Sequence, residues 1–368
     1  MCGGVDEDVS ETCKSVRVNK GEYILKNKYY NLEKNGGKSY TLTLKQSPTL
    51  YQYRTINKYT TDALLNSEVF ATVPASFNDP YDSSWCYDEK RIKKEIAKRI
   101  PNGEEEQYRN AITKDFENTI DGSFDLIETI FERLVIGSIK NHKEGICVSC
   151  YSERIDSEIM WAHYAGNATG FQVEYDGQQL KSLADDHRNR FVNVAKSVNL
   201  AGIDLSSYPE PDYVSLFPVI YTALKPNYES IFSKVIDPLF SYFEKCINGD
   251  DVMDATTAYL TTLIDGTHDD TLRDRTHTLL CSKQKTWSYE KEWRIWSYNM
   301  NPLIGQMLDK HVYLGKVKPL AICLGEYISK YDEIALVEIA KTILDIPVYK
   351  MKTQINRNSM KLVPYQIY

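Results

Sequence analysis

The sequence has no long apolar run, no excess of basic charge and no secretory leader pattern. None of its hydrophobic stretches approaches the roughly 18 residues that a membrane-spanning helix requires. Lys and Arg number 44 against 51 Asp and Glu, which gives a formal net charge of −7 and a pI near 5.5. The net charge therefore does not indicate a chain-wide nucleic-acid surface, which usually raises a domain's pI above about 9, although a local basic groove stays compatible with it.

The sequence also lacks the common catalytic fingerprints. It contains no GxGxxG dinucleotide loop, no GxxxxGK[ST] phosphate loop, no GxSxG nucleophile elbow and no HExxH metal motif. A single CxxC, Cys147 to Cys150, would need His163 and a further ligand to complete a zinc site, so we predict no metal centre. A nucleophilic pair of Cys150 and His163 is an alternative use of the same residues.

Eight cysteines are scattered along the chain, several of them in apolar strand-like runs. This usage is typical of reduced, buried thiols in an intracellular protein. The first residues, Met1 to Glu7, are acidic and polar and lack the basic and apolar regions of a signal peptide. We therefore expect a cytoplasmic protein with no membrane partner.

Composition and patterning predict a globular α+β protein. The chain has 368 residues, of which 42% are hydrophobic and 26% charged. Residues 1–20 are charged and aperiodic, which predicts a mobile tail. In residues 21–368, strand-like and helical segments alternate at irregular spacing, which favours a single core with a mixed or antiparallel central sheet. Helical patterns near 88–142 and 227–283 predict insertions that cover this sheet.

Local patterns predict the individual elements. Alternating residues on both sides of Asn35-Gly36-Gly37 predict a hairpin. The basic stretch at 90–99 is compatible with phosphate contact but is more typical of a solvated helix face. We expect strands at 50–56, 69–73, 146–152, 170–175, 292–297, 311–314, 320–324, 346–350 and 361–367, short helices at 61–67, 157–164 and 330–343, and a loop at 74–82.

The segment from Lys285 to Trp296 is the most informative one. If it is a strand throughout, Glu290, Glu292 and Arg294 share one face, opposite Trp293 and Ile295. Two carboxylates on one face repel each other, and this repulsion raises the pKa of one of them. The same alternation is also typical of an outward-facing strand surface on which Arg294 pairs with a glutamate.

Three strand-like segments carry Arg54, then Ser149 and Ser152, then Glu290 and Glu292. This order resembles the arginine-serine-glutamate class of mono-ADP-ribosyltransferases. The resemblance implies that Arg54 binds the diphosphate of NAD and that Ser149 or Ser152 supports the nicotinamide-ribose pocket. It further implies that Glu292 stabilises the ribose cation and that Glu290 orients or deprotonates the acceptor.

The residue types suit this chemistry. Cleavage of the nicotinamide-ribose bond develops positive charge on the sugar, which a carboxylate stabilises. A guanidinium binds a diphosphate with a rigid fork of donors. We assign further NAD-binding roles to the aromatic residues Tyr53, Trp287 and Tyr289. Asn78 and Asp79 are candidates for holding a polar ligand, although turn residues such as these also serve as caps.

A second resemblance covers more of the chain. Five segments carry it: Tyr51 to Arg54, Phe77 to Asp82, Met160 to Tyr164 with Gly170-Phe171, Lys285 to Arg294 and Leu324-Gly325. They resemble the bacterial family called domain of unknown function 2971. The resemblance spans roughly residues 48–350 and implies a bacterial cytoplasmic protein. It implies no activity, so the function depends on the residues themselves.

We carry three hypotheses from the sequence. The first is an NAD-cleaving ADP-ribosyltransferase, as a toxin or antiviral effector, with a macromolecular acceptor. The second is a non-enzymatic binding or regulatory module of a bacterial defence system. The third is a metal-dependent nuclease or hydrolase that uses Asp79, Asp82, Glu174 and Glu290. The transferase needs NAD and no metal, the nuclease needs metal and no NAD, and the module needs neither.

Overall fold

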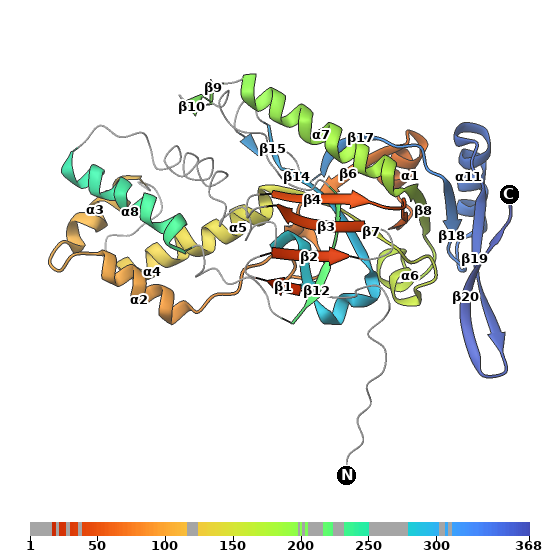
Figure 1. Ribbon diagram of the computed structural model, residues 1–368, viewed down its shortest axis with the longest axis horizontal. Helices are drawn as coiled ribbons and strands as arrows, with labels where there is room; N and C mark the ends of the chain where they lie inside the picture. Colours follow the sequence, from red (N-terminus) through yellow and green to blue (C-terminus); the bar gives the residue numbers. More distant parts are fainter. Residues whose placement is uncertain are drawn as a thin grey trace, which may run out of the picture.

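The computed structural model describes residues 17–19, 22–26, 30–35, 39–115, 124–197, 199–200, 203–204, 216–223, 232–249, 279–301, 306–307 and 311–368. Within these ranges the chain is an α+β protein built on a ten-stranded sheet (Figure 1). The strands are β1 (Arg17–Asn19), β2 (Glu22–Lys26), β3 (Tyr30–Asn35), β4 (Ser39–Leu44), β5 (Thr49–Arg54), β6 (Glu68–Thr72), β7 (Ile146–Ser152), β8 (Phe171–Asp176), β9 (Asn199–Leu200), β10 (Ile203–Asp204), β11 (Leu216–Pro218), β12 (Ile220–Thr222), β13 (Ser282–Gln284), β14 (Glu292–Tyr298), β15 (Met300–Asn301), β16 (Gln306–Met307), β17 (His311–Lys316), β18 (Ala321–Leu324), β19 (Val348–Asn356) and β20 (Ser359–Gln366).

Helices connect these strands and cover parts of the sheet. The α-helices are α1 (Lys58–Leu65), α2 (Glu89–Arg99), α3 (Glu105–Asp115), α4 (Leu126–Ile130), α5 (Gly137–Glu144), α6 (Glu158–Tyr164), α7 (Gly177–Ser197), α8 (Phe232–Asn248) and α11 (Lys330–Ile339). Short 3-10 helices span η1 (Pro74–Ser76) and η5 (Lys285–Glu290), and π-helical turns span η2 (Phe131–Ile136) and η6 (Ala340–Leu344).

The large sheet is mixed and mostly antiparallel, as the sequence predicts. Its strand order is β11-β14-β7-β5-β8-β18-β19-β20, and β6 joins β7 to β17 beside this path. The pair β18–β19 is parallel, and the other pairs of this sheet are antiparallel. The long connection between β8 and β14 therefore returns the chain to the far side of β7.

The strand register decides which side chains share a face of the sheet. Glu292 on β14 lies opposite Ser152 on β7, which in turn lies opposite Tyr51 on β5. Directly paired residues point to the same face, and successive residues of a strand point to opposite faces. We call this side the α6 face, because the residues of α6 pack on it against Tyr53.

The opposite side of the sheet carries the main hydrophobic core. Side chains of α7 and α11 pack there on strands of the sheet, and Tyr30 of β3 makes an edge-to-face contact with Trp293, with 5.2 Å between ring centroids. We call this side the α7 face. It buries Leu50, Val173 and Ile322 almost completely, so it contributes much of the hydrophobic stabilisation of the sheet.

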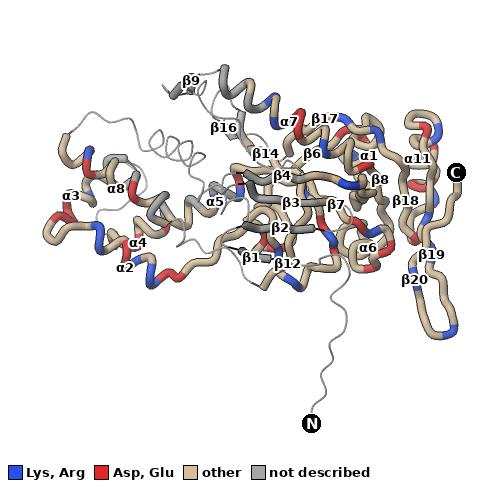
Figure 2. The backbone as a smooth tube through the Cα atoms, in the orientation of Figure 1, with Lys and Arg blue, Asp and Glu red and all other residues tan. Residues whose placement is uncertain are grey.

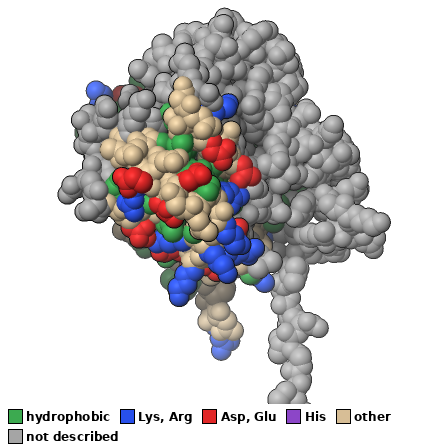
Figure 3. All heavy atoms as spheres, turned by 90° about the vertical axis from the view of Figure 1, so that its left-hand side faces the viewer, with side chains coloured by type: hydrophobic (Ala, Val, Ile, Leu, Met, Phe, Trp, Pro, Cys, Tyr) green, Lys and Arg blue, Asp and Glu red, His purple; other side chains and the backbone are tan. Residues whose placement is uncertain are grey.

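The helices of the predicted insertions form a hydrophobic core of their own. Ile92 and Ile96 of α2 pack with Tyr108 of α3 and Phe243 of α8, at the left of Figure 1. Acidic and basic side chains are interspersed on the outer surface of this end of the molecule (Figure 3). The basic stretch at 90–99 accordingly forms helix α2, and three of its cations, Lys93, Lys98 and Arg99, pair with nearby carboxylates, as expected of a solvated helix face.

Two glycines allow a close approach of the backbone beside α6. A Cβ atom on Gly170 would lie 2.2 Å from the carbonyl oxygen of Arg54, and one on Gly325 would lie 2.1 Å from that of Ala168. The backbone N–H of Gly325 donates to the carbonyl oxygen of Gly170 at 2.9 Å. No other residue type fits here without moving the chain, since real Cβ atoms do not approach so closely.

Most expected elements are present. The hairpin around Asn35, the strands β5, β6, β7 and β8 and the short helix α6 occur where the patterns predict them. The C-terminal strands form a hairpin longer than expected, at Val348–Asn356 and Ser359–Gln366. Of the predicted tail only Arg17–Asn19 is described, as β1, and most of the second helical block beyond α8 lies outside the described residues.

One local prediction is wrong. The segment from Lys285 to Trp296 is not a continuous strand, because η5 occupies Lys285–Glu290 and Lys291 takes a left-handed conformation with φ of 45° before β14 begins. None of the described helices is long and apolar enough to span a bilayer.

Candidate functional site

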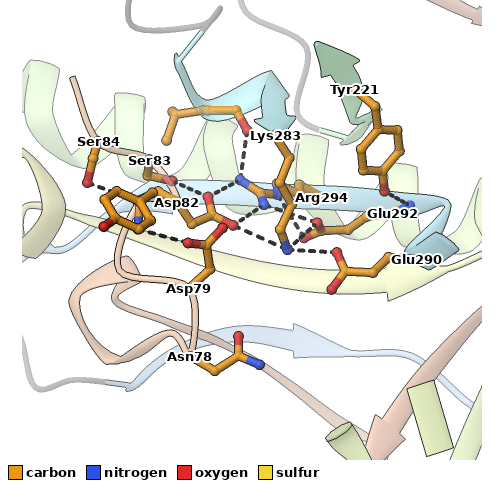
Figure 4. Close-up of polar contacts among 12 residues, drawn as sticks. Asn78, Asp79, Asp82, Ser83, Ser84, Tyr221, Lys283, Glu290, Glu292 and Arg294 are labelled. Atoms are coloured by element: carbon orange, nitrogen blue, oxygen red, sulfur yellow. Dashed lines mark hydrogen bonds and ion pairs between the residues drawn. The ribbon is translucent and has the colours of Figure 1, made fainter. Parts of the chain in front are cut away.

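A group of five charged side chains is buried on the α6 face of the sheet (Figure 4). It consists of Asp82 from the loop before α2, Lys283 from β13, Glu290 from the end of η5, and Glu292 and Arg294 from β14. We call this group the ion cluster. All five residues are at most 5% exposed, so water does little to stabilise their charges, and mutual pairing must replace it.

Arg294 uses all of its donors inside the ion cluster. Its Nη1 and Nη2 donate to the two carboxylate oxygens of Asp82 at 2.9 and 2.6 Å, and Nη1 also donates to the carbonyl oxygen of Leu280 at 3.0 Å. Its Nε and Nη2 donate to the two oxygens of Glu292 at 2.8 and 3.0 Å. The guanidinium thus forms forked contacts with two carboxylates, an arrangement that its planar geometry favours.

Lys283 connects the three carboxylates of the ion cluster. Its Nζ lies 2.7 Å from Glu290, 3.2 Å from Glu292 and 3.4 Å from Asp82. The same ammonium lies 4.8 Å from the centre of the Trp287 ring, a distance at which a cation is attracted to an aromatic face. Sequence reasoning missed Lys283, whose only signal is a lysine next to the apolar run Leu279-Leu280-Cys281.

The charges of the ion cluster set its protonation. Burial alone would raise the pKa of every carboxyl group here, but Arg294 and Lys283 hold the pKa values of Asp82 and Glu292 below their ordinary range. Burial and repulsion from Glu292 raise the pKa of Glu290 to about 7, against the opposing pull of Lys283. Two cations serve three carboxylates, so Glu290 is the group that exchanges a proton near neutral pH.

A chain of hydrogen bonds links Glu290 to an exposed side chain. The Oε1 atom of Glu290 accepts a hydrogen bond from the half-buried Tyr164 hydroxyl at 2.6 Å, and Asn78, which is exposed, donates to that hydroxyl at 3.4 Å. Trp287 and Tyr289, also half-buried, lie on the same short helix with their ring centroids 5.9 Å apart. Glu290 is therefore hydrogen-bonded to one half-buried aromatic side chain, Tyr164, and shares its short helix with two others, Trp287 and Tyr289.

The local backbone holds Glu290 in this position. Ser152 Oγ donates to the carbonyl oxygen of Glu290 at 2.5 Å and accepts from the backbone N–H of Arg154 at 3.0 Å. The left-handed residue Lys291 follows, and its carbonyl oxygen accepts from the N–H of Glu153 at 3.1 Å. A non-glycine residue in this conformation is strained and is held by its surroundings. Glu290 and Glu292 thereby converge although they do not share one strand.

Arg54 does not join this site. Its Nη2 donates to Gln52 Oε1 at 2.5 Å, and Gln52 Nε2 donates to Ser149 Oγ at 3.2 Å. By register, these side chains lie on the α7 face, whereas Glu292 lies on the α6 face. Arg54 is three residues from Tyr51, and Ser149 is three residues from Ser152, so both point away from the face that Tyr51, Ser152 and Glu292 share. The structure therefore does not bring Arg54 and Ser149 together with Glu292.

Other predicted site residues have structural roles. Ser149 is buried and also donates to the Tyr151 hydroxyl at 3.1 Å. Ser152 is fully buried and holds the backbone of Glu290, so it supports the site without facing a ligand. Tyr53 is buried against Trp161, with ring centroids 5.2 Å apart, and its hydroxyl donates to the carbonyl oxygen of Arg154 at 2.7 Å. It is a core residue beneath α6.

Asp79 is buried at 3% exposure in the loop that carries Asp82. Its Oδ1 accepts from the backbone N–H of Tyr81 at 2.9 Å, which is a turn contact, while its Oδ2 has no hydrogen-bond partner among the residues that the structure describes. Asn78, one residue earlier, reaches the Tyr164 hydroxyl. The structure thus places Asn78 and Asp79 beside the ion cluster. The contact of Asp79 with the N–H of Tyr81 is the turn-forming contact that the sequence allows.

The structure supports neither the zinc site nor the nucleophilic cysteine that the sequence left open at Cys147 and Cys150. Cys147 and Cys150 are three positions apart on β7 and therefore point to opposite faces. Burial raises the pKa of both thiols, that of Cys147 to about 12, whereas a nucleophilic cysteine needs a lowered pKa. Among the described residues no group of three or more His, Cys, Asp and Glu side chains is arranged to hold a metal ion.

Comparison with known families agrees with part of the resemblance seen in the sequence. Searches among curated proteins and among solved structures found no match. Residues 160–295 match the model of a family described as "Protein of unknown function (DUF2971)". This range begins in α6 and ends in β14, so it contains Tyr164, Lys283, Glu290, Glu292 and Arg294. The chain is therefore similar to that family over a little more than a third of its length, and this part carries most of the ion cluster.

Proposed function

We propose that the chain is an enzyme that cleaves the bond between nicotinamide and ribose in NAD and transfers the ADP-ribose group to an acceptor. The observation that carries this proposal is Glu290, a buried carboxyl group with a pKa of about 7. It accepts hydrogen bonds from the half-buried Tyr164 and from Lys283. Groups with shifted pKa values next to specific charge partners are typical of catalytic sites.

Glu290 is better suited to the reaction than Glu292, to which the sequence resemblance gives the main role. Glu292 receives two hydrogen bonds from Arg294 and one from Lys283, and these cations hold its pKa below the ordinary value. A carboxylate whose pKa is lowered in this way does not accept a proton near pH 7. We therefore assign Glu292 to positioning Lys283 and Arg294, and the chemical step to Glu290.

The chemistry balances with Glu290 alone. The bond between ribose C1′ and the nicotinamide nitrogen breaks, and its electron pair neutralises the positive charge of the nicotinamide ring. The sugar becomes an oxocarbenium-like cation, which the ionised Glu290 carboxylate stabilises. A hydroxyl or amine of the acceptor then bonds to C1′, and the proton that it loses passes to Glu290. A base with a pKa near 7 suits this last transfer.

In this proposal the nicotinamide ring stacks on the aromatic side chains of η5. Trp287 and Tyr289 are half-buried and adjacent to Glu290, and flat rings stack favourably on such side chains. Arg54 has no part in the proposal, since it lies on the α7 face. The setting that we propose, a bacterial cytoplasmic toxin or antiviral effector with a macromolecular acceptor, rests on the sequence order alone, because Arg54 and Ser149 do not meet Glu292 in the arrangement that the arginine-serine-glutamate resemblance implies.

Release of nicotinamide from NAD tests the proposal. The purified protein is incubated with NAD and an acceptor-rich cell lysate, beside Glu290→Gln and a matched control, Glu158→Gln, which changes an exposed carboxylate on α6. We expect Glu290→Gln to lose at least about 100-fold of the rate and Glu158→Gln to retain it. Absence of release by the folded wild-type protein would refute NAD cleavage.

Arg54→Gln separates the revised site from the arrangement that the sequence order suggests. We expect this variant to release nicotinamide at the wild-type rate, because its side chain lies on the other face of the sheet from Glu290's neighbour Glu292. A large rise in the KM for NAD in Arg54→Gln would instead restore Arg54 to the substrate site and contradict the revised assignment.

A binding module without catalysis is the second candidate. It is favoured by the complete mutual pairing of Asp82, Glu292 and Arg294, which is what a purely structural network needs. Under this hypothesis Glu290→Gln folds normally and no NAD is consumed. The third hypothesis, a metal-dependent nuclease, has less support, because the carboxylates of Asp82, Glu290 and Glu292 already contact Lys283 or Arg294.

A further inference from the structure

The hairpin of β19 and β20 extends beyond the rest of the molecule, at the lower right of Figure 1. Its base is anchored, because Met351 is buried against the α6 face and Lys350 pairs with Glu333 of α11 at 2.6 Å. From Lys352 to Lys361 every residue is exposed. We call residues 352–363 the C-terminal arm.

The C-terminal arm is basic on an acidic chain. Residues 346–368 contain Lys350, Lys352, Arg357 and Lys361 and no Asp or Glu, while the whole chain has a formal net charge of −7. Figure 2 shows basic residues at the tip of this hairpin. Lys352 lies over the ring of Tyr365, at 3.9 Å from its centre. Arg357 and Lys361 have no acidic partner among the residues that the structure describes, so their charges are available to a ligand.

The register gives the C-terminal arm two different faces. Ile355 lies directly opposite Met360, and Thr353 opposite Leu362, on one face. Ile355 and Met360 are 71% and 66% exposed, and nothing described covers them. On the other face Lys352 lies opposite Val363 and Lys361 lies opposite Gln354. The turn itself reads Asn356-Arg357-Asn358-Ser359.

This combination fits a nucleic acid better than a membrane or a protein strand. A membrane-inserting tip would place apolar side chains at its end, whereas all four turn residues here are polar. Addition of a protein strand to the edge of β20 is hindered by Pro364, which lacks an N–H donor, and by Lys361. A two-stranded ribbon fits the major groove of B-form DNA, and exposed apolar side chains can contact thymine methyl groups there.

We propose that the C-terminal arm binds duplex DNA, with Lys352, Arg357 and Lys361 on the phosphates and with Ile355 and Met360 against the bases in the groove. This binding is independent of the proposed NAD chemistry. The overall charge of −7 does not oppose it, because phosphate contacts act within about 10 Å, the distance over which salt screens charge. Binding through three cations displaces counterions and is therefore strongly dependent on salt.

Fluorescence anisotropy with a labelled duplex of mixed sequence tests the proposal. The full-length protein is compared with the triple variant Lys352→Gln, Arg357→Gln, Lys361→Gln over a series of salt concentrations. We expect the triple variant to bind at least about 30-fold more weakly at low salt, and the slope of log affinity against log salt to fall by about 3. The control triple variant Lys90→Gln, Lys94→Gln, Lys98→Gln on α2 should keep both values.

Further variants and probes make the test decisive. Ile355→Ser with Met360→Ser should weaken binding without changing the salt slope, because it removes contacts that carry no charge. A-form RNA duplex should bind more weakly, since its deep, narrow major groove does not admit a ribbon. All substituted side chains are exposed, and thermal unfolding verifies that each variant is folded.

Several results would overturn the proposal. No anisotropy change at low salt would do so, as would an unchanged affinity and slope in the arm triple variant. If polyglutamate bound the C-terminal arm as tightly as DNA, the arm would be a surface for acidic proteins. If vesicles of phosphatidylglycerol bound it and DNA did not, it would be a membrane contact.

Discussion

At the scale of single residues, the protonation of Glu290 separates it from its neighbours. Its folded pKa of about 7 lies above its ordinary value of 4.5, mainly through burial and then through repulsion from Glu292. Asp82 and Glu292 are shifted in the opposite direction by Arg294 and Lys283. Within the ion cluster, the pKa of one carboxyl group is therefore raised and the pKa values of the other two are lowered.

Glu290 should make the protein less stable as the pH rises. Its contribution is fully present below pH 4.5, where the unfolded chain is also protonated, and is lost as the pH rises through about 7. Between pH 5 and pH 7.5 the contribution of Glu290 to the free energy of unfolding, measured with urea, should fall by about 2 kcal/mol in the wild type, at 1.36 kcal/mol per pKa unit. Glu290→Gln should remove most of this loss, and an equal loss in both proteins would contradict the assignment.

Tyr164 should tune the pH dependence of the reaction. Its hydroxyl donates to Glu290 and lowers the pKa of that carboxyl group, so Tyr164→Phe should raise it further. If Glu290 must be ionised to act, the midpoint of the pH–rate profile for nicotinamide release should move upwards by as much as about one unit. An unchanged midpoint together with a lower rate would mean that Tyr164 contacts the substrate and does not tune Glu290.

At the scale of elements, the ion cluster joins parts of the chain that are far apart in sequence. Asp82 comes from the loop that leads into α2, while Arg294 lies on β14, next to the edge strand β11 of the sheet. Their forked contact therefore fixes the entrance to the helical insertion against the sheet. Breaking one partner of such a buried pair leaves the other charge uncompensated.

A double-mutant cycle should measure this connection. Asp82→Asn and Arg294→Met should each reduce the free energy of unfolding by about 3–5 kcal/mol. The double variant should lose less than the sum, with a coupling of about 1–3 kcal/mol. The exposed pair of Arg154 and Asp156, 3.0 Å apart, is the matched control and should give no more than about 1 kcal/mol. Additive losses at Asp82 and Arg294 would refute the connection.

Sequence patterns predicted those elements whose side chains alternate within a single segment. Strands β5, β7 and β8 and helix α6 are of this kind, since their period of two or the i, i+4 spacing of Met160 and Tyr164 is local information. The segment before β14 differs, because the left-handed backbone of Lys291 interrupts a pattern that looks like a continuous strand.

The candidate site depended on information that no segment carries alone. Glu290 and Glu292 were identified as a carboxylate pair, and they do converge on Lys283. The face of Arg54 could not be predicted, because it follows from the register in which Tyr51 pairs with Ser152. The burial of Arg294 was also missed: the sequence suggested an outer salt-bridged surface, but the loop of Asp82 covers that face.

At the scale of the whole molecule, the described residues form one hydrophobic core on each face of the sheet and a separate core in the helical insertion. The core of the insertion contains side chains of α2, α3, α4 and α8 and none from the ten-stranded sheet. Such a unit can open without the rest of the molecule, because local unfolding follows groups of residues that pack together.

Hydrogen exchange should separate the insertion core from the sheet. Ile96 of α2 is fully buried in the insertion core, so Ile96→Ala should destabilise that core by about 2–5 kcal/mol. We expect faster amide exchange in α2, α3 and α8, and unchanged exchange in β5, β7 and β8. Faster exchange throughout the sheet would mean that the insertion core and the sheet unfold together.

Lys283 provides a positive charge at the centre of the site from a side chain of the protein itself. The ammonium that lies among Asp82, Glu290 and Glu292 is attached covalently to β13. It cannot dissociate, exchange with the cell's pool of ions or be removed by a chelator. The arrangement of these carboxylates is therefore ready as soon as the chain has folded, at any concentration of divalent ions in its surroundings.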